Sequence, residues 1–235
     1  MQTTVGATRI LIYGDSITFA RIPGELTRFN EQTRWPGVMQ QLLGRGYEVI
    51  AEGLRARMLR GENPYIGYRD GYEQFGPILA SHLPLDLLVI LLGSNDACNG
   101  ANKSPLDIAH DLRDYFPLLR DWCEQQHMPV PKVLIVAPPA IVEENLKGEV
   151  YRGAEVIIRD LPELYAAVAR ENEALFFNAA AIVAGSKEDG VHLDATDNKL
   201  LGRELAEFIA QACPSYAGIG LTESSVSHEG KLGSA

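Results

Sequence analysis

Cysteine is scarce in this 235-residue sequence, and its spacing argues against two kinds of stabilisation. Only Cys98, Cys123 and Cys213 occur, they lie far apart, and none belongs to a Cys-x-x-Cys pair. An odd number of cysteines at such spacing indicates neither a disulfide framework nor a structural zinc site. We therefore expect a domain that folds without disulfide bonds or bound metal.

Positive charge is also in short supply. The chain has 21 lysines and arginines against 31 aspartates and glutamates, which gives a formal net charge of −10 at pH 7. A strongly acidic protein repels the phosphate backbone of nucleic acids and anionic membrane surfaces. Neither nucleic acid nor a membrane is therefore expected as a partner.

Long hydrophobic runs and cofactor-binding motifs are absent. The apolar run at residues 10–13 is far too short to span a bilayer, and the first residues lack the basic start and apolar stretch of a signal peptide. We therefore expect a cytoplasmic protein. The sequence has no Walker phosphate loop, no His-Glu-x-x-His and no Gly-x-Gly-x-x-Gly, so we expect a reaction without a cofactor.

Short apolar runs separated by helical patterns make up most of the chain. Hydrophobic residues account for 46% of it, enough for a sizeable core. Four runs read as buried strands and a fifth is weaker: Arg9–Tyr13, Tyr47–Ala51, Leu85–Leu92, Lys132–Ala137 and Ala174–Phe177. Strands that alternate with helices favour a parallel sheet covered on both faces. The sequence therefore predicts a flavodoxin-like, three-layer α/β/α domain with a five-stranded parallel sheet.

Apolar residues at helical spacing lie between these runs and predict helices that pack on the sheet. The stripes are Trp35, Val38, Leu42 and Leu43; Ile108, Leu112, Tyr115, Phe116 and Leu119; Leu161, Leu164, Tyr165 and Val168; and Leu200, Leu201, Leu205, Phe208 and Ile209. Residues 55–76 are rich in arginine, glycine and tyrosine, and we expect a long surface loop there. One domain is predicted over residues 1–221, followed by a flexible tail over residues 222–235.

Chemically useful side chains follow the ends of the predicted strands, where parallel α/β sheets bind their ligands. Ser16 follows the turn Gly14-Asp15 at the end of the first strand, and His192 lies three residues after Asp189, before the last predicted helix. A hydrolytic serine needs a base that takes its proton and a third group that holds the base in the right tautomer. We therefore predict Ser16 as nucleophile, His192 as base and Asp189 as the orienting carboxylate.

Donors for a developing oxyanion can be placed at the same edge of the sheet. A tetrahedral intermediate needs preorganised hydrogen-bond donors where its negative charge develops. The candidates are the Ser16 N–H, the side-chain amide of Asn95 at the end of the third strand, and a backbone N–H near Ala56. Each of these turns alone is an ordinary structural turn, but their conjunction at strand ends favours an active site.

Three sequence blocks resemble those of the SGNH hydrolases, also called the GDSL esterase/lipase family. Gly14-Asp15-Ser16-Ile17 matches the first block, with Ile in place of the usual Leu. Gly93-Ser94-Asn95-Asp96 matches the third block and Asp189-Gly190-Val191-His192 matches the last. The similarity runs from about Arg9 to Ala212 and is closest to the bacterial arylesterase/acyltransferase branch, in the segments 34–38, 52–57, 82–87 and 105–109.

This resemblance implies the SGNH hydrolase fold and assigns roles to residues of this chain. It makes Ser16, Asp189 and His192 a catalytic triad and Asn95 an oxyanion donor, while Ala56 stands where the family has a glycine and keeps the backbone N–H. Relatives of this branch often assemble, so a homo-oligomer is expected. We also expect substrate contacts from four residues beside Ser16 and His192 in the sequence: Asp15, Ile17, Phe19 and Val191.

The leading hypothesis is a serine esterase that hydrolyses short-chain acyl (acetyl or aryl) esters of small molecules through an acyl-enzyme, with acyl transfer to alcohols as a further reaction. The charged Arg21 near the predicted pocket argues against efficient acyl transfer to alcohols in water. A sugar acetylesterase with the same triad is one alternative, because aromatic and basic residues could stack on a sugar ring: Arg57, Arg60, Tyr65, Tyr68, Arg69 and Tyr72. A non-catalytic flavodoxin-like module that binds an anion at helix N-termini is another.

Overall fold

A computed structural model describes residues 6–215 of the chain. Its sheet has five strands in the order β2-β1-β3-β4-β5, and every neighbouring pair is parallel. The strands are β1 (Thr8–Gly14), β2 (Tyr47–Gly53), β3 (Leu87–Leu91), β4 (Lys132–Ala137) and β5 (Leu175–Asn178). All five lie where the apolar runs predict them, so the predicted α/β fold is confirmed. The tail predicted over residues 222–235 lies outside the described residues.

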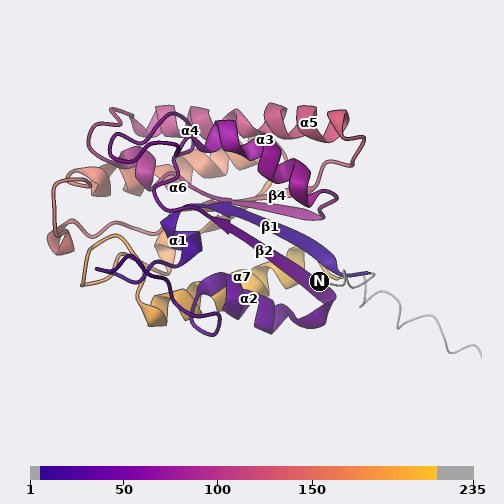
Figure 1. The fold of residues 1–235 in the computed structure, drawn as a ribbon, viewed down its shortest axis with the longest axis horizontal. Coiled ribbons are helices and arrows are strands. Elements are labelled where there is room, and N and C mark those ends of the chain that lie inside the picture. Colours follow the sequence, from indigo (N-terminus) through magenta and orange to yellow (C-terminus); the bar gives the residue numbers. More distant parts are fainter. Residues whose placement is uncertain (1–5, 216–235) are drawn as a thin grey trace, which may run out of the picture.

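Helices cover both faces of the sheet (Figure 1). One face carries α3 (Gly71–His82), α4 (Pro105–Arg113), α5 (Tyr115–Gln125) and α6 (Ala154–Glu171), and the other carries α1 (Ser16–Phe19), α2 (Trp35–Leu43) and α7 (Ala195–Ala212). The apolar side chains form two core clusters that take alternate residues of the strands: along β1, Leu11 and Tyr13 join one cluster and Ile10 and Ile12 the other. β3 lies in the middle of the sheet, and all of its residues are buried.

The predicted helical stripe over residues 108–119 is divided between two helices. α4 ends at Arg113 and α5 begins at Tyr115, with Asp114 between them. α4 starts with a capping box, in which Asp107 N–H donates to Ser104 Oγ at 3.2 Å and Ser104 N–H donates to Asp107 Oδ2 at 2.9 Å. Apolar spacing does not reveal the break because both helices pack on the same core cluster.

The expectation of a surface loop over residues 55–76 is wrong for both ends of that stretch. Residues 57–59 are buried, and the Arg57 guanidinium lies 4.1 Å from the centre of the Tyr13 ring. An aromatic face has therefore replaced water around this charge. At the other end α3 begins inside the stretch, where Asp70 caps it by accepting two backbone N–H groups of its first turn.

The carboxyl ends of the strands meet at one edge of the sheet, on the left in Figure 1, where α1 also lies. The sequence blocks that carry Ser16 and Asn95 directly follow β1 and β3, so both reach this edge. Over residues 6–215, no helix combines the length and the apolar character needed to cross a membrane.

Candidate active site

Ser16 is the first residue of α1, immediately after the turn that ends β1. The Asp15 carboxylate caps this short helix by accepting the Ile17 N–H at 2.8 Å. Gly14 is required for the close approach, because a Cβ atom there would lie 2.0 Å from Thr18 Oγ1 and 3.0 Å from the Leu91 carbonyl oxygen. The turn therefore fixes Ser16 at the carboxyl edge of the sheet, where its side chain is nearly buried.

The loop before α7 brings His192 and Asp189 to Ser16. His192 Nε2 lies 3.0 Å from Ser16 Oγ, although the two residues are 176 positions apart. His192 Nδ1 lies 2.8 Å from Asp189 Oδ2, and the backbone N–H groups of Val191 and His192 donate to Asp189 Oδ1 at 3.1 and 2.9 Å. These three side chains form one hydrogen-bonded chain with the geometry of a serine hydrolase triad.

The charge of Asp189 determines the tautomer of the histidine. Burial raises the pKa of Asp189, but the hydrogen bonds from the His192 side chain and backbone outweigh burial and hold that pKa well below its usual range. An ionised Asp189 accepts a proton-bearing Nδ1, which leaves the lone pair of His192 Nε2 facing the Ser16 hydroxyl. His192 is therefore oriented to accept the serine proton.

The two backbone N–H groups predicted as oxyanion donors belong to Ser16 and Ala56, which line one cavity. The N–H groups of Ser16 and Ala56 have no hydrogen-bond acceptor among residues 6–215. Ala56 lies in the left-handed region with φ of 64°, a conformation that glycine adopts without strain. Ala56 lines the same cavity as Ser16, so its N–H is a candidate donor to an oxyanion there.

The side chain of Asn95 is held by three neighbours. Its Nδ2 donates to Asp15 Oδ2 and to the Arg57 carbonyl, both at 3.1 Å, and its Oδ1 accepts the Tyr151 hydroxyl at 2.7 Å. Both protons of the amide therefore have protein acceptors, so a donation to an oxyanion would share one of them. Tyr151 is a contact that sequence reasoning missed, because it belongs to no motif and lies in the segment before α6.

A cavity of about 360 Å³ opens beside these groups. It is lined by Ser16, Arg21, Leu26, Arg55, Ala56, Asn63, Tyr65, Ile66, Arg69, Asn95, Val150, Tyr151 and His192. The predicted nucleophile, base and oxyanion donors thus share one cavity, which lies at the carboxyl edge of the sheet. Cys98 is buried and does not line it.

The four residues predicted to contact substrate do not line this cavity. Asp15, Ile17 and Val191 are buried, and the Ile17 carbonyl accepts the Trp35 indole N–H at 2.9 Å inside the core. The Phe19 ring lies instead beneath two guanidinium groups, 5.1 Å from Arg28 and 5.8 Å from Arg55. Neighbours of Ser16 in the sequence point away from it because α1 turns successive side chains in different directions.

The six residues considered for sugar stacking are also dispersed. Tyr65 and Arg69 line the cavity, but Arg57 is buried behind it. Arg60 lies 4.4 Å from the centre of the Tyr72 ring and pairs with Asp114, away from Ser16. Within residues 6–215, no three His, Cys, Asp or Glu side chains are grouped so as to hold a metal ion.

Comparisons with known proteins agree with this geometry. The model of the GDSL-like lipase/acylhydrolase family matches residues 12–201. The M. smegmatis aryl esterase is 34% identical in an alignment that covers 87% of this chain and 99% of that one, with a TM-score of 0.82. Est24, a carbohydrate acetylesterase from Sinorhizobium meliloti, is 32% identical with the same coverage and TM-score. A search of curated proteins found no match.

The chain therefore belongs to the GDSL-like lipase/acylhydrolase family, as its sequence blocks indicate. Within that family it is a serine esterase, a hydrolase of carboxylic esters.

Proposed function

We propose that this esterase cleaves short-chain acyl esters through an acyl-enzyme on Ser16. The observation that carries the proposal is the hydrogen-bonded chain from Ser16 Oγ through His192 to Asp189, with contacts of 3.0 and 2.8 Å. The adjoining cavity of about 360 Å³ suits a small substrate. Esters of acetic acid and of other short carboxylic acids are therefore the expected substrates.

In the first half-reaction Ser16 Oγ attacks the carbonyl carbon while His192 Nε2 takes the serine proton. The oxyanion that forms is stabilised by the N–H groups of Ser16 and Ala56, and by Asn95 through a shared amide proton. Collapse of the tetrahedral intermediate breaks the bond to the alcohol, which leaves with the proton from His192. The acyl group then remains on Ser16 as an ester.

In the second half-reaction water attacks this ester and gives a proton to His192. The second intermediate collapses, the carboxylic acid leaves, and Ser16 recovers its proton from His192. The ionised Asp189 stabilises the imidazolium that is present in both half-reactions. Each proton taken by His192 is returned within the same half-reaction, so the cycle closes without another reactant.

The test combines a covalent label with two matched variants. The protein is treated with a fluorophosphonate, the adduct is mapped by peptide mass, and turnover of p-nitrophenyl acetate and butyrate is measured. Ser16→Ala should lose the adduct and at least about a thousandfold in kcat. Ser81→Ala makes the same change on α3 and should keep both the adduct on Ser16 and the wild-type kcat. Among residues 6–215 the Ser81 hydroxyl donates to the Pro77 carbonyl alone.

Two outcomes would contradict the proposal. An adduct on another residue, or full activity in Ser16→Ala, would remove Ser16 as the nucleophile. A wild-type protein with no adduct and no turnover would favour the non-catalytic binding module.

A sugar acetylesterase is the second candidate function. It is favoured by the similarity to Est24 and by Tyr65, an aromatic side chain that lines the cavity and is 54% exposed. Comparing kcat/KM for acetylated sugars with that for aryl acetates separates the two candidates. Assembly into a homo-oligomer and a cytoplasmic location stay predictions from the sequence.

A further inference from the structure

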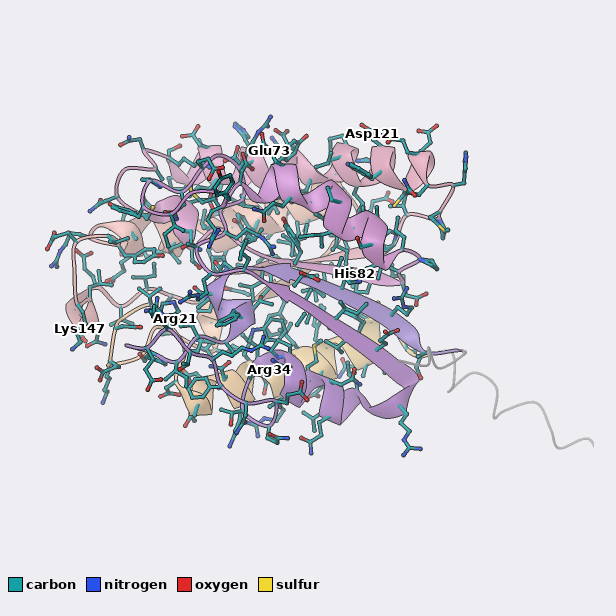
Figure 2. All side chains as sticks on the ribbon, in the orientation of Figure 1. Arg21, Arg34, Glu73, His82, Asp121 and Lys147 are labelled. Atoms are coloured by element: carbon teal, nitrogen blue, oxygen red, sulfur yellow. The ribbon has the colours of Figure 1, made fainter. Side chains whose placement is uncertain are left out.

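Three arginines line the cavity beside Ser16, in a protein whose net charge is −10. They are Arg21 from the segment after α1, and Arg55 and Arg69 from the segment between β2 and α3. All three are half-buried, and none of the described residues that line the same cavity is an aspartate or a glutamate. Figure 2 shows Arg21 at the left-hand end of the molecule, the end at which the strands finish.

The hydrogen bonds of these guanidinium groups go to backbone carbonyls. Arg21 Nε donates to the Glu25 carbonyl, and Arg55 Nη1 donates to the Leu26 carbonyl at 3.2 Å. Arg69 Nε donates to the Arg55 carbonyl at 2.8 Å, and its Nη1 donates to two further carbonyls at 3.0 Å. These bonds fix the orientation of the side chains, but their acceptors are neutral carbonyls; the Arg55 guanidinium also lies 5.8 Å from the centre of the Phe19 ring.

Several donors of the three arginines have no acceptor in the part of the chain that the structure describes. They are both terminal nitrogens of Arg21, Nε and Nη2 of Arg55, and Nη2 of Arg69. None of the three guanidinium groups has a carboxylate oxygen within ion-pair distance over residues 6–215. Other arginines of the chain do have one, for example Arg113 with Glu171 and Arg9 with Glu48.

The nearby carboxylates already have other partners. The Glu62 side chain accepts the backbone N–H of Arg69, and the Glu25 side chain accepts the Thr27 hydroxyl. Asp189 is bonded to His192. Three like charges gathered in one half-buried cavity repel one another, and guanidinium groups bind carboxylate and phosphate oxygens with two parallel hydrogen bonds.

We propose that this cavity selects esters that carry an anionic group close to the scissile bond. The inference rests on the proposed esterase function of Ser16 and names its substrate class. The anion would sit between the free donors of Arg21, Arg55 and Arg69, while the carbonyl carbon lies at Ser16. Apolar side chains of Leu26, Ile66 and Val150 line the same cavity and would contact the hydrocarbon part.

The anionic group can belong to the acyl part or to the alcohol part of the ester, and two pairs of substrates distinguish these sources. The acyl pair is the mono-4-nitrophenyl ester of adipic acid and the same compound with its free carboxylate methylated. The alcohol pair is 3-acetoxybenzoate and its methyl ester. In each pair the reacting acyl–oxygen bond is the same, and spontaneous hydrolysis is subtracted.

The measured quantity is the ratio of kcat/KM for the anionic ester to that for its neutral partner. In the wild type this ratio should exceed about ten for at least one pair, because hydrogen bonds to charged groups are stronger than those between neutral groups. Most of the difference should appear in KM, and raised ionic strength should reduce it. Using a ratio within each variant cancels any general loss of active protein.

Arg21→Gln and Arg55→Gln should each lower this ratio several-fold, and Arg21→Lys should restore part of it because the charge returns without the planar fork. Arg45→Gln is the matched control. Arg45 is exposed, precedes β2 at the opposite edge of the sheet and has no ion pair in the described residues. The ratio of kcat/KM values measured for Arg45→Gln should therefore equal that of the wild type.

A wild-type ratio at or below one in both pairs would overturn the inference, and so would a preference that survives both glutamine variants. If neutral esters are turned over through Ser16 without any anionic preference, the esterase proposal stands and this inference alone is wrong. If Ser16→Ala keeps full activity, or the wild type is inert toward every ester, the proposed function fails and the inference with it.

Discussion

Asp15 and Asp189 are two carboxylates at the same edge of the sheet, and they have opposite charge preferences. Burial raises the pKa of Asp189, but the hydrogen bonds from His192 outweigh it and hold the pKa well below the usual range. Burial also raises the pKa of Asp15, here to about 7. The hydrogen bond from the Ile17 backbone N–H lowers this pKa by less than burial raises it, and the nearby charge of Asp96 raises it further. The hydrogen bonds of Asp189 therefore favour its ionised form at neutral pH, whereas burial favours the protonated form of Asp15.

The number of hydrogen-bond donors and the degree of burial together explain the difference. Asp189 accepts from the His192 ring, from the backbone N–H groups of Val191 and His192, and from Gly24 N–H at 3.1 Å. Asp15, which is fully buried, accepts from Ile17 N–H and from the Asn95 amide. The degree of burial and the local hydrogen bonding together, and not position at the sheet edge, therefore decide which carboxylate serves as an anion.

The largest effect expected from this comparison is on activity, in Asp189→Asn. An asparagine keeps the size of the side chain but cannot hold a proton-bearing His192 Nδ1 as an ionised carboxylate does. We expect kcat for p-nitrophenyl acetate to fall by about a thousandfold to ten-thousandfold. A fall of tenfold or less, in a variant whose circular dichroism shows that it is folded under the assay conditions, would show that Asp189 does not orient His192.

Much of this arrangement follows from the sequence. Five apolar runs predict the strands, and parallel topology then brings the segments after them to one edge, so that Ser16 and Asn95 meet there. The loop of Asp189 and His192 is placed at Ser16 as predicted. The catalytic roles of these residues stay predictions until the variants are measured.

Other parts of the site depend on tertiary packing that a sequence pattern does not contain. Tyr151 reaches Asn95 across 56 positions, and nothing in its neighbours marks it. The sequence predicts Arg57 in a surface loop, but its side chain is 2% exposed, because the Tyr13 ring and backbone carbonyls surround it. Phe19 sits close to Ser16 in sequence, yet it stacks between arginines outside the cavity.

The second expected effect is on the pH dependence of stability, in Asp15→Asn. Asp15 binds its proton more tightly in the folded protein, where its pKa is about 7, than in the unfolded chain, where it is about 4. Its contribution to stability is therefore fully present below about pH 4 and is lost as the pH rises through about 7. Between about pH 5 and pH 8 this loss amounts to about 2–3 kcal/mol of unfolding free energy. The variant should therefore show a flatter profile than wild type in that window.

Urea unfolding at several pH values measures this profile, and Asp189→Asn is the matched control. The pKa of Asp189 is lowered on folding, so its contribution is present above its unfolded pKa and is lost as the pH falls below about 4. Asp189→Asn should lower the unfolding free energy by a constant amount above about pH 4 and flatten the profile only below it. Parallel profiles for Asp15→Asn and wild type between about pH 5 and pH 8 would mean that Asp15 is already ionised at pH 5.

The smallest expected effect is on kcat, in Tyr151→Phe. Tyr151 holds Asn95, whose side-chain amide donates a hydrogen bond to Asp15. The substitution keeps the ring and removes the hydroxyl that donates to Asn95 Oδ1 at 2.7 Å. Asn95 would keep its two Nδ2 contacts but gain freedom to rotate, so we expect kcat to fall by about threefold to tenfold with a smaller change in KM.

Tyr47→Phe is the control, because it removes a comparable hydrogen bond, to the Cys213 carbonyl at 2.9 Å, at the other edge of the sheet. Both variants should lose about 1 kcal/mol of stability, and equal kcat values in the two would show that Tyr151 only stabilises the fold.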